Sequence, residues 1–587
     1  MDNQEIAKIL YEISEYLAIE DVPFKPRAFE KAAISVESLE KEMTDIYKKE
    51  GLKGLLKIPA IGQGIAERIE ELIKTGKMKY YQQLKNKIPI KLGELIAVEG
   101  IGPKMVKKLY KNLGIKNLKD LEKAAKARKI RYLEDFGEKT EQNILQGIAF
   151  LKRSKGRFIL GEILATVKEV YEKLKKLKEV EEIDYCGSIR RMKETIGDVD
   201  FLVTVDDSKG SAFAKASADA IADFFVSLPG VIKIWGKGST KASVRMRGGF
   251  DMDIRIVPKK SYGAALQYFT GSKDHNIVLR KIAIDKGLKL SEYGLFSAKG
   301  GPASGGRMIA GETEEGIYKR LKMDWIPAEM RENQGEVEAA LKFKLPKIIN
   351  YNDIKGDLHC HSDWDGGANS IEEIALAVQE MGYQYIGIAD HTKFLRIEHG
   401  LDEKEIIQRN KEIDKFNEKF KNFKILKGCE ANILNDGYID IRDDVLAKLD
   451  FVIAGVHSSF KMEKNKMTER IIKAIKNPNV DILSHPTGRL IQRRDEYQID
   501  FDKILRVARE TKAILEINAF PERLDLNDQN IRRAKETGVK MVINTDSHHI
   551  DQLGFIEFGI AQARRGWAEK KDIINAWPVE KMLKMLK

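Results

Sequence analysis

The chain has 587 residues, 43% of them apolar and 33% charged, which is enough for three or four domains with separate cores. It contains no run of about 18 apolar residues and no basic-then-apolar start, so membrane and secreted proteins are excluded and a cytoplasmic protein is expected. Three cysteines without a C-x-x-C pair exclude a disulfide framework.

The net charge of +12 is unevenly distributed. It is +9 over residues 1–160, +5 over 161–350 and −2 over 351–587, whereas eight of the nine histidines lie at or after His359. The basic front half predicts an anionic partner such as nucleic acid, although a lysine-rich solvated surface would carry the same charge.

Residues 1–155 show helical periodicity, interrupted by three glycine turns at 58–66, 98–105 and 135–140. Each turn opens into an amphipathic helix whose first backbone amides point outward and can hold a phosphate. The repeated pattern resembles the helix-hairpin-helix motif, which binds the DNA backbone, rather than ordinary turns between packed helices. The resemblance implies DNA contacts at Gly62, Gly64, Gly100, Gly102 and Lys104.

From about residue 180 short β-rich segments predict an α+β domain with a sheet. Asp198 and Asp200 open the strand 201–205 and share one face, and Asp253 lies in the segment 251–255 on a later strand. Adjacent carboxylates suit a hard divalent cation, and two ions held by three aspartates can bind a triphosphate and activate a 3′-hydroxyl. The turn at Gly187 and Ser188, followed by Arg190, offers partners for the phosphates. The alternative is that the aspartates belong to an acidic strand at the surface.

With the segment Tyr268 to Ser272, these motifs closely resemble a family X DNA polymerase over residues 1–320. The resemblance implies that the three aspartates bind two Mg²⁺ or Mn²⁺ ions, with Asp253 as the proton acceptor nearest the primer hydroxyl. Ser188 and Arg190 would hold the incoming triphosphate. The remaining implied contacts are to the sugar (Tyr268, Phe269, Gly271), the base (Asn276) and the template (Arg280). The alternatives are that the aromatic pair belongs to the core and that Arg280 is a surface ion-pair partner.

One activity found in this family is not expected. Members with a deoxyribose-phosphate lyase use a lysine of the first hairpin as a Schiff-base nucleophile, and that position is Gly64 here, with Arg68 at the supporting lysine. An arginine stays protonated and is no amine nucleophile. We therefore predict weak or no lyase activity by this route.

The last third alternates apolar strands with helices, which predicts a βα barrel or a doubly wound sheet. Imidazoles and carboxylates stand at the ends of these strands and are too numerous for one ion, so they predict a multi-metal hydrolase acting on phosphorus. Residues 352–575 closely resemble the polymerase-and-histidinol-phosphatase (PHP) domain, a distorted barrel that binds up to three Zn²⁺, Mn²⁺ or Fe²⁺ ions. The ligands that this resemblance implies are His359, His361, His391, Glu430 (bridging), His457, His485, Asp546 and His548.

Some residues near these ligands depart from the PHP pattern. At the position where the family usually has an aspartate ligand, this chain has Gly366. Asp365, one place earlier, is a candidate for that ligand through a shifted loop, and the alternative is that it does not bind the metal. His399 and His549 have no predicted role. Arg489 and Arg494 are expected either to contact DNA phosphates or to form salt bridges.

Together the patterns predict a multidomain α and α/β protein. The predicted domains are helical helix-hairpin-helix regions at 1–85 (lyase-like) and 86–155 (fingers-like), a nucleotidyltransferase α+β palm at 156–260, a thumb at 261–335, a linker at 336–351 and a (β/α)7-type PHP domain at 352–587. The expected enzyme is a monomeric, template-directed polymerase that fills short gaps in DNA with deoxynucleoside triphosphates. Its PHP domain would act as a 3′–5′ exonuclease, 3′-phosphatase or AP endonuclease. The alternatives are another nucleotidyltransferase, a fused small-molecule phosphatase, or a DNA-end binding scaffold.

Overall fold

A computed structural model of the chain describes residues 3–20, 22–23, 25–37, 43–58, 61–96, 98, 101–154, 157–206, 210–297 and 307–586. The chain divides into two compact units, Met1–Lys155 and Gly156–Lys587. No helix in these described ranges is both long and apolar enough to cross a membrane.

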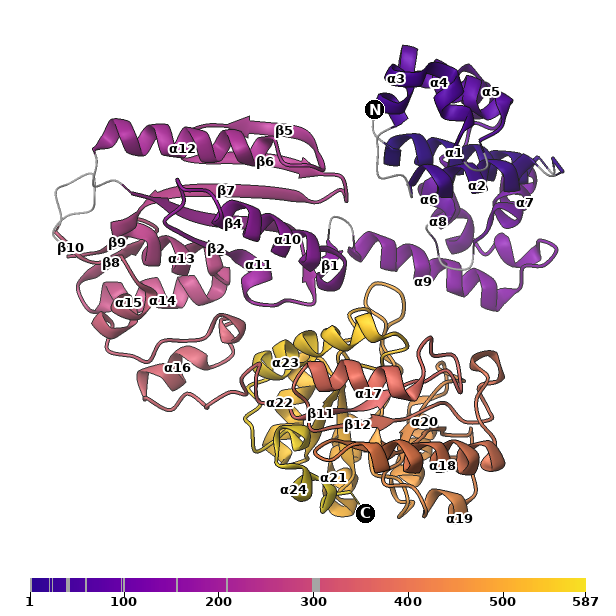
Figure 1. Cartoon of the computed structure of the whole chain (residues 1–587), viewed down its shortest axis with the longest axis vertical. Coiled ribbons are helices and arrows are strands. Elements are labelled where there is room, and N and C mark those ends of the chain that lie inside the picture. The colour runs from indigo at the N-terminus through magenta and orange to yellow at the C-terminus, as the bar shows by residue number, and fades with distance from the viewer. Residues whose placement is uncertain are drawn as a thin grey trace. The chain divides into compact units, whose positions relative to one another are not determined.

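The first unit is helical, as the periodicity predicts (Figure 1). Its core is continuous from Ile6 to Ile148, so the two helical segments expected as separate domains share one core, and the Tyr16 hydroxyl donates to the carbonyl of Ile90 across them. Its helices are α1 (Asn3–Ile19), α2 (Lys25–Glu37), α3 (Met43–Leu56), α4 (Gln63–Thr75), α5 (Lys79–Lys87), α6 (Leu92–Ile96), α7 (Pro103–Leu113), α8 (Leu118–Lys126), η1 (Ile130–Tyr132) and α9 (Glu138–Ser154).

The palm is built on a five-stranded sheet in the order β2-β4-β7-β6-β5, in which only β4 and β7 are parallel. The strands are β2 (Glu182–Tyr185), β4 (Asp198–Val205), β5 (Val231–Lys237), β6 (Lys241–Met246) and β7 (Asp251–Pro258). Two helices pack on this sheet, α10 (Leu160–Lys175) and the alanine-rich α12 (Ser211–Val226). A small pair, β1 (Phe158–Ile159) with β3 (Thr195–Ile196), and the short α11 (Gly187–Arg190) complete the palm.

The thumb follows directly and has its own core. It contains α13 (Tyr262–Thr270), α14 (Lys273–Asp285), α15 (Glu314–Arg320), α16 (Glu336–Leu341) and the antiparallel strands β8 (Leu288–Ser291), β9 (Gly294–Ser297) and β10 (Met308–Ala310). The helix α13 also contacts β4 and β7 of the palm, and this contact joins the two sub-structures beside the aspartates.

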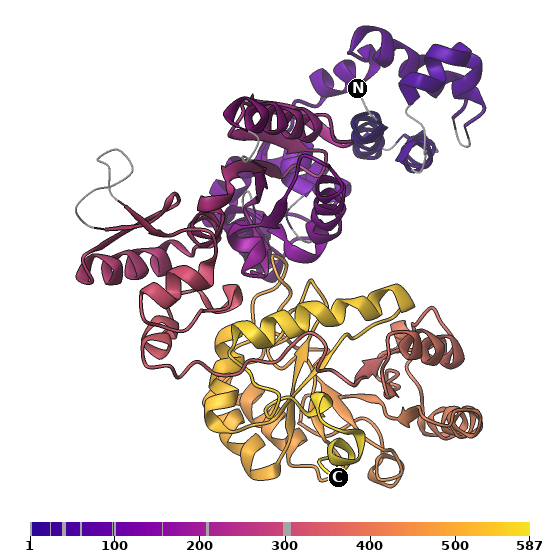
Figure 2. The ribbon, with the colours of Figure 1, turned by 60° about the vertical axis from the view of Figure 1, so that its left-hand side comes forward.

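The C-terminal part consists of two parallel sheets with helices around them (Figure 2). One sheet holds β11 (Gly356–Cys360), β12 (Tyr385–Ile388) and β13 (Lys424–Lys427). The other holds β14 (Glu430–Asn432), β15 (Ile453–Gly455), β16 (Ile482–Leu483), β17 (Ile514–Asn518) and β18 (Met541–Asn544). Single parallel bridges, Cys360 with Ser547 and His391 with Glu430, link the two sheets, and closure into a full barrel stays a prediction.

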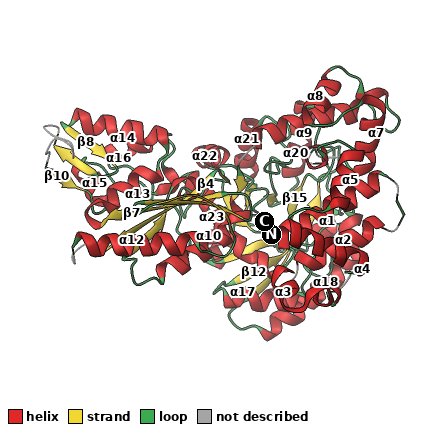
Figure 3. Ribbon diagram, turned by 90° about the horizontal axis from the view of Figure 1, so that it is seen from above, coloured by secondary structure: helices red, strands yellow, loops and turns green. Residues whose placement is uncertain are grey.

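The helices of this part connect successive strands, as βα units require (Figure 3). They are α17 (Ile371–Glu380), α18 (Glu403–Lys419), α19 (Asp443–Leu446), α20 (Lys464–Ile475), α21 (Phe501–Thr511) and α22 (Asp528–Thr537). The helices α23 (Ile556–Arg565) and α24 (Val579–Leu583) follow β18, the last of these strands. The apolar segments at 385–388, 453–455, 482–483, 514–518 and 541–544 form strands, and their side chains are buried on both faces, which is typical of parallel sheets.

Candidate active sites

The palm aspartates share one edge of the sheet because of the register between two parallel strands. Asp200 of β4 lies opposite Asp253 of β7, and Asp198 precedes Asp200 by two residues and so faces the same way. Burial, together with the charges of Asp198 and Asp253, raises the pKa of Asp200 to about 6. The three carboxylates therefore repel one another and favour a cation between them.

A cation that sequence reasoning missed lies against these carboxylates. The Lys241 amine on β6 lies 2.6 Å from a carboxylate oxygen of Asp253. Among the described residues, the tight clusters of candidate metal-binding atoms all lie in the C-terminal part, and the palm aspartates form none. A donor set of carboxylates alone nevertheless matches what Mg²⁺ or Mn²⁺ prefers.

The turn predicted to bind phosphates lies next to these carboxylates. Gly187 has a φ of 67°, and a β-carbon built there would stand 3.4 Å from Asp200 Oδ2, so glycine suits the position. The Cys186 amide donates to the Asp200 carbonyl at 2.7 Å and holds the turn, with Ser188 in its short helix, against β4.

The two arginines after this turn have different partners. Arg190 points into the palm–thumb junction, where it donates to both oxygens of Glu314 at 2.9 and 3.0 Å and to the Thr270 hydroxyl at 2.8 Å. Both terminal nitrogens of Arg190 thus have protein partners, and the triphosphate-binding role predicted for it stays a prediction. The next residue, Arg191, faces a different space.

Arg191 lines a cavity of about 290 Å³ between the palm and the thumb. Its other lining residues include Tyr268, Phe269, Gly271, Asn276 and Arg280, all of which were predicted to contact the nucleotide or the template. The rings of Tyr268 and Phe269 meet edge to face at 5.2 Å, and the Arg255 guanidinium lies 4.2 Å above Phe269.

Asn276 is a lining residue with a second task. It is 8% exposed, its amide nitrogen donates to the Tyr268 carbonyl at 2.7 Å, and its oxygen accepts from Gln267 at 2.7 Å. It therefore ties α14 to α13 and holds the wall of the cavity in place. Arg280 is exposed one turn later, so it can reach outward.

In the first unit, two of the predicted DNA-contacting turns begin helices. Gly62 is the residue before α4 and Gly102 the residue before α7, and no described side chain caps either helix start. Gly64 lies in the first turn of α4 and Lys104 in that of α7, both exposed. The amides of both turns thus point away from their helices with a positive dipole behind them. Gly100 lies outside the described residues.

The histidine cluster of the C-terminal part surrounds one carboxylate. Glu430 Oε1 lies 3.2 Å from His457 Nε2 and 3.0 Å from His485 Nε2, while Oε2 lies 2.8 Å from His391 Nδ1 and 3.4 Å from His359 Nε2. This central place is the one that the bridging role predicts. Asp546 and His548 approach from the other side, where Asp546 Oδ1 is 3.4 Å from His361 Nε2 and the His548 ring stacks on His361 at 4.0 Å.

Second-layer carboxylates and amides orient the imidazoles toward the centre. The Nδ1 atoms of His359, His361 and His457 pair with Glu516 at 2.7 Å, Asp365 at 2.7 Å and Asn432 at 3.1 Å. Partners of this kind settle the tautomer of a metal-binding histidine. Asp365 also accepts from the His391 and Gly367 amides, so both of its oxygens are engaged. It also forms a group of potential metal ligands with His361 and Asp390, and its role as a ligand stays a prediction.

Several observations fit divalent cations in this cluster. The buried atoms His359 Nε2, His361 Nε2 and Glu430 Oε2 have no hydrogen-bond partner among the described residues. A β-carbon at Gly455 would come within 3.0 Å of Ser484, His457 and Glu430, so the glycine keeps this space open. Four overlapping groups of three potential ligands lie within 4.8 Å of one another, and they include seven of the eight predicted ligands, all except His485.

Burial and neighbouring carboxylates act in opposite directions on the pKa values of the imidazoles in the cluster. Burial lowers the pKa of His457 and of His548 to about 4, so both imidazoles are neutral at pH 7 and able to bind a metal. In contrast, Asp365 raises the pKa of His361 to about 10 against the effect of burial, because the surrounding carboxylates attract a cation.

A cavity of about 490 Å³ opens onto the cluster. Phe460, Phe520, Arg494 and Arg523 line it together with the histidines, and the Arg494 guanidinium lies 3.8 Å above the Phe460 ring. Arg489, the other arginine considered for phosphate contact, is 8% exposed and pairs with Glu194 at 2.7 Å, so it has the salt-bridge role. His399 and His549 are not among the cavity's lining residues, as expected of histidines without a role.

Family models match nearly every part of this architecture. Residues 1–78 match a helix-hairpin-helix domain, 92–149 a SAM-like helix-hairpin-helix tandem, 160–228 the DNA polymerase beta palm, 265–332 the DNA polymerase beta thumb, and 357–520 the PHP domain.

Curated relatives match either the whole chain or its last third. The chain is 37% identical over 579 residues to the DNA polymerase/3′-5′ exonuclease PolX of Bacillus subtilis (strain 168), covering 98% of both chains. A probable phosphatase of Thermoanaerobacter sp. (strain X514) is 32% identical over 233 residues, which cover 37% of this chain and 89% of the relative. A probable phosphatase of Caldicellulosiruptor bescii is 31% identical over 215 residues, 34% of this chain and 82% of the relative. The chain therefore belongs to the PolX group of family X DNA polymerases, which carry a C-terminal PHP domain.

Proposed function

We propose that the chain is a template-directed DNA polymerase that fills short gaps during repair, and that its PHP domain removes nucleotides from DNA 3′ ends. The observation that carries the polymerase assignment is the β4–β7 register, which brings Asp198, Asp200 and Asp253 to one edge of the palm sheet. Gapped or primed DNA and deoxynucleoside triphosphates are the proposed substrates.

In the polymerase site each residue has a task that follows from its place. Asp198, Asp200 and Asp253 would hold two Mg²⁺ or Mn²⁺ ions, which supply charge neutralisation for the triphosphate and activation of the primer 3′-hydroxyl when bound. Gly187 and Ser188 would offer an amide and a hydroxyl to the phosphates. Arg191 would add a forked cation from the cavity between the palm and the thumb. Tyr268, Phe269 and Gly271 would form the wall against the sugar.

In the PHP site His359, His361, His391, Glu430, His457, His485, Asp546 and His548 would hold up to three Zn²⁺, Mn²⁺ or Fe²⁺ ions, which supply an activated water and stabilise the leaving oxygen when bound. The side chains around the cluster suggest what is cleaved. Phe460 and Phe520 offer faces for an unstacked base, and Arg494 and Arg523 offer cations for its phosphates. These features favour a nucleotide end over a small phosphate ester as the substrate. The similarity to the probable phosphatases is what keeps a phosphatase as the second candidate.

Separate substitutions at the two sites test this division. Asp200→Asn should abolish extension of a gapped primer and leave 3′–5′ degradation within about twofold of wild type, because its carboxylate lies only in the palm. His361→Ala should do the reverse. Loss of both activities in either variant would refute two independent sites. Turnover of histidinol phosphate in preference to a labelled 3′ end would favour the phosphatase alternative.

The setting of this enzyme is also a proposal. We expect it to act in the cytoplasm as a monomer, because its predicted partners are DNA and nucleotides and the described helices include no membrane span. Sedimentation of the purified chain with and without gapped DNA would show whether one copy suffices for binding.

A further inference from the structure

The PHP domain reaches the palm through a buried arginine at the end of α23. Arg565 is 4% exposed, and its Nη1 donates to the backbone carbonyl of Arg191 at 2.9 Å and to Glu332 Oε1 at 3.1 Å. Its Nη2 pairs with Asp528 of α22 in the PHP domain itself. One guanidinium therefore connects the PHP domain, the end of the thumb and the palm.

Glu332 is shared between Arg565 and the arginine of the nucleotide cavity. The same oxygen, Oε1, accepts from Arg191 Nε at 3.0 Å, and Lys193 lies 3.6 Å away. Arg191 Nη1 meanwhile donates to the Thr270 carbonyl in the cavity wall. The direction of the Arg191 fork is thus set by Glu332 and Thr270, while Arg565 holds both Glu332 and the backbone of Arg191.

We infer that Arg565 is a positioning residue for nucleotide addition, through which the PHP domain sets the Arg191 guanidinium that binds the incoming triphosphate. This rests on the proposed role of Arg191. The physical reason has two parts. Without Arg565 the Arg191 backbone loses a charge-assisted hydrogen bond, and Glu332 is neutralised by Arg191 more strongly, so less positive charge remains for the phosphates.

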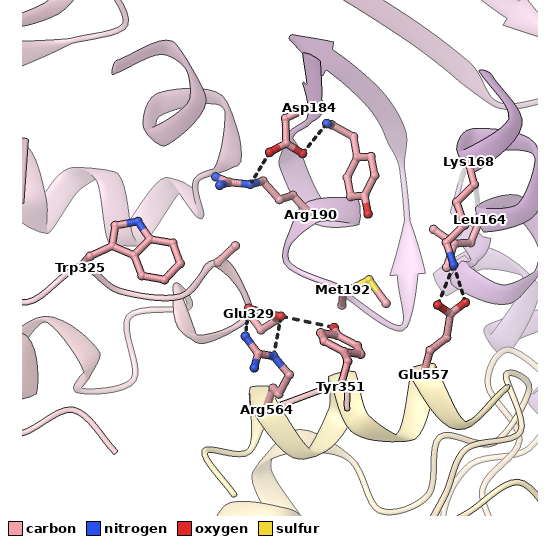
Figure 4. Close-up of a pocket in the computed structure, with 12 residues that line it drawn as sticks. Leu164, Lys168, Asp184, Arg190, Met192, Trp325, Glu329, Tyr351, Glu557 and Arg564 are labelled. Carbon is pink, nitrogen blue, oxygen red and sulfur yellow. Dashed lines mark hydrogen bonds and ion pairs between the residues drawn. The ribbon is translucent and has the colours of Figure 1, made fainter. Parts of the chain in front are cut away.

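The rest of the palm–PHP interface supplies a matched control. Lys168 of α10 donates to both oxygens of Glu557 on α23 at 2.6 and 2.8 Å, and Arg564 pairs with Glu329 at 2.7 Å (Figure 4). These pairs line a cavity of about 300 Å³ that includes Arg190 but not Arg191. Lys168→Met therefore removes a PHP–palm ion pair from the same helix α23 without touching the nucleotide cavity.

The test is single-nucleotide gap filling by the full chain, with the deoxynucleoside triphosphate titrated, and 3′–5′ degradation of single-stranded DNA measured on the same preparations. Arg565→Gln should raise KM for the nucleotide about 10-fold with a smaller change in kcat, because coupling through buried contacts is worth about that much. Arg565→Lys should restore part of the affinity, since it keeps the charge but lacks the fork. Lys168→Met should stay within about twofold of wild type, and degradation should be unchanged in all three.

The variants Arg191→Lys and Asp528→Asn complete the design. If Arg191→Lys leaves KM for the nucleotide unchanged, the proposed role of Arg191 is wrong and the inference loses its basis. If Arg191→Lys raises KM but Arg565→Gln does not, the inference alone is refuted. Asp528→Asn frees Arg565 from α22 while leaving it in the chain, so it should raise KM in the same direction even if Arg565→Gln fails to fold. Equal loss of synthesis and degradation in Asp528→Asn would mean that the contact only holds the domains together.

Discussion

Glu516 offers the sharpest test of how the PHP cluster is organised. Its side chain is completely buried on β17, and its two oxygens accept four hydrogen bonds. Oε1 accepts from His359 Nδ1 at 2.7 Å and from Asn544 at 3.0 Å, and Oε2 accepts from the His485 amide at 2.8 Å and from Asn518 at 3.1 Å. One carboxylate thus orients two of the proposed metal ligands.

Glu516→Gln keeps the size of the side chain and replaces one acceptor by a donor. In either orientation the new amide group faces two donors, so two of the four bonds are lost. The other consequence is the loss of the negative charge beside His359 and His485. Changes to such partners of metal ligands weaken metal affinity by about 10- to 100-fold, or about 1.4 to 2.7 kcal/mol.

The assay is the Mn²⁺ dependence of 3′–5′ degradation, together with the metal content of the dialysed protein. The control is Asp481→Asn. Asp481 is also buried, at 7% exposed, and accepts from the Val452 amide at 2.8 Å. It precedes β16, however, whereas His485 follows this strand, so the two residues lie at opposite ends of it. Primer extension should be unchanged in both variants. An unchanged Mn²⁺ dependence and metal content in a folded Glu516→Gln protein would refute the orienting role.

Three further predictions concern the front of the chain. Arg331 and Arg190 hold the pKa of Glu314 well below its usual range although burial raises it, so Glu314→Gln should lower the free energy of unfolding by about 3–5 kcal/mol at pH 7. That stabilisation is present above the unfolded-state pKa of Glu314 and is lost as the pH falls toward its lower folded-state pKa. The difference in melting temperature between wild type and Glu314→Gln should therefore shrink progressively below about pH 4.5. For Asp200, whose pKa is raised to about 6 by burial and the neighbouring aspartates, the sign is opposite: without divalent cations the melting temperature should fall as pH rises through 6, and Mg²⁺ should remove this effect. Equal melting temperatures at pH 5 and pH 7 would contradict that reasoning. Finally, because the first hairpin has Gly64 in place of the lyase lysine, borohydride should trap no covalent complex with an abasic 5′-phosphate end, and a trapped complex would refute this prediction.

The chemistry of both sites was predictable from local sequence patterns. The i, i+2 spacing of Asp198 and Asp200 determines that they share a face, because strand side chains alternate. Likewise, histidines placed where apolar strands end must meet at one end of a parallel sheet, so the ordered set from His359 to His548 predicted a cluster before any contact was known. Local periodicity was enough in both cases.

The division of tasks between neighbouring residues depended on contacts across the chain. Arg190 and Arg191 are identical side chains, and only the burial of Glu314 against the first of them leaves the second to face the nucleotide cavity. Glu516 follows no recognisable spacing, yet it meets His359 because β11 and β17 point their side chains to a common centre.

Asp365 shows the same limit from the other side. Its place in the sequence suggests a metal ligand, and the structure adds a contact with His361 Nδ1 at 2.7 Å through which it orients the imidazole, which sequence spacing alone does not indicate. Sequence spacing determines which groups can lie on one face of an element. Which of them receives a partner is decided when distant elements pack together, because a buried charge is costly unless an opposite charge or hydrogen bonds compensate it.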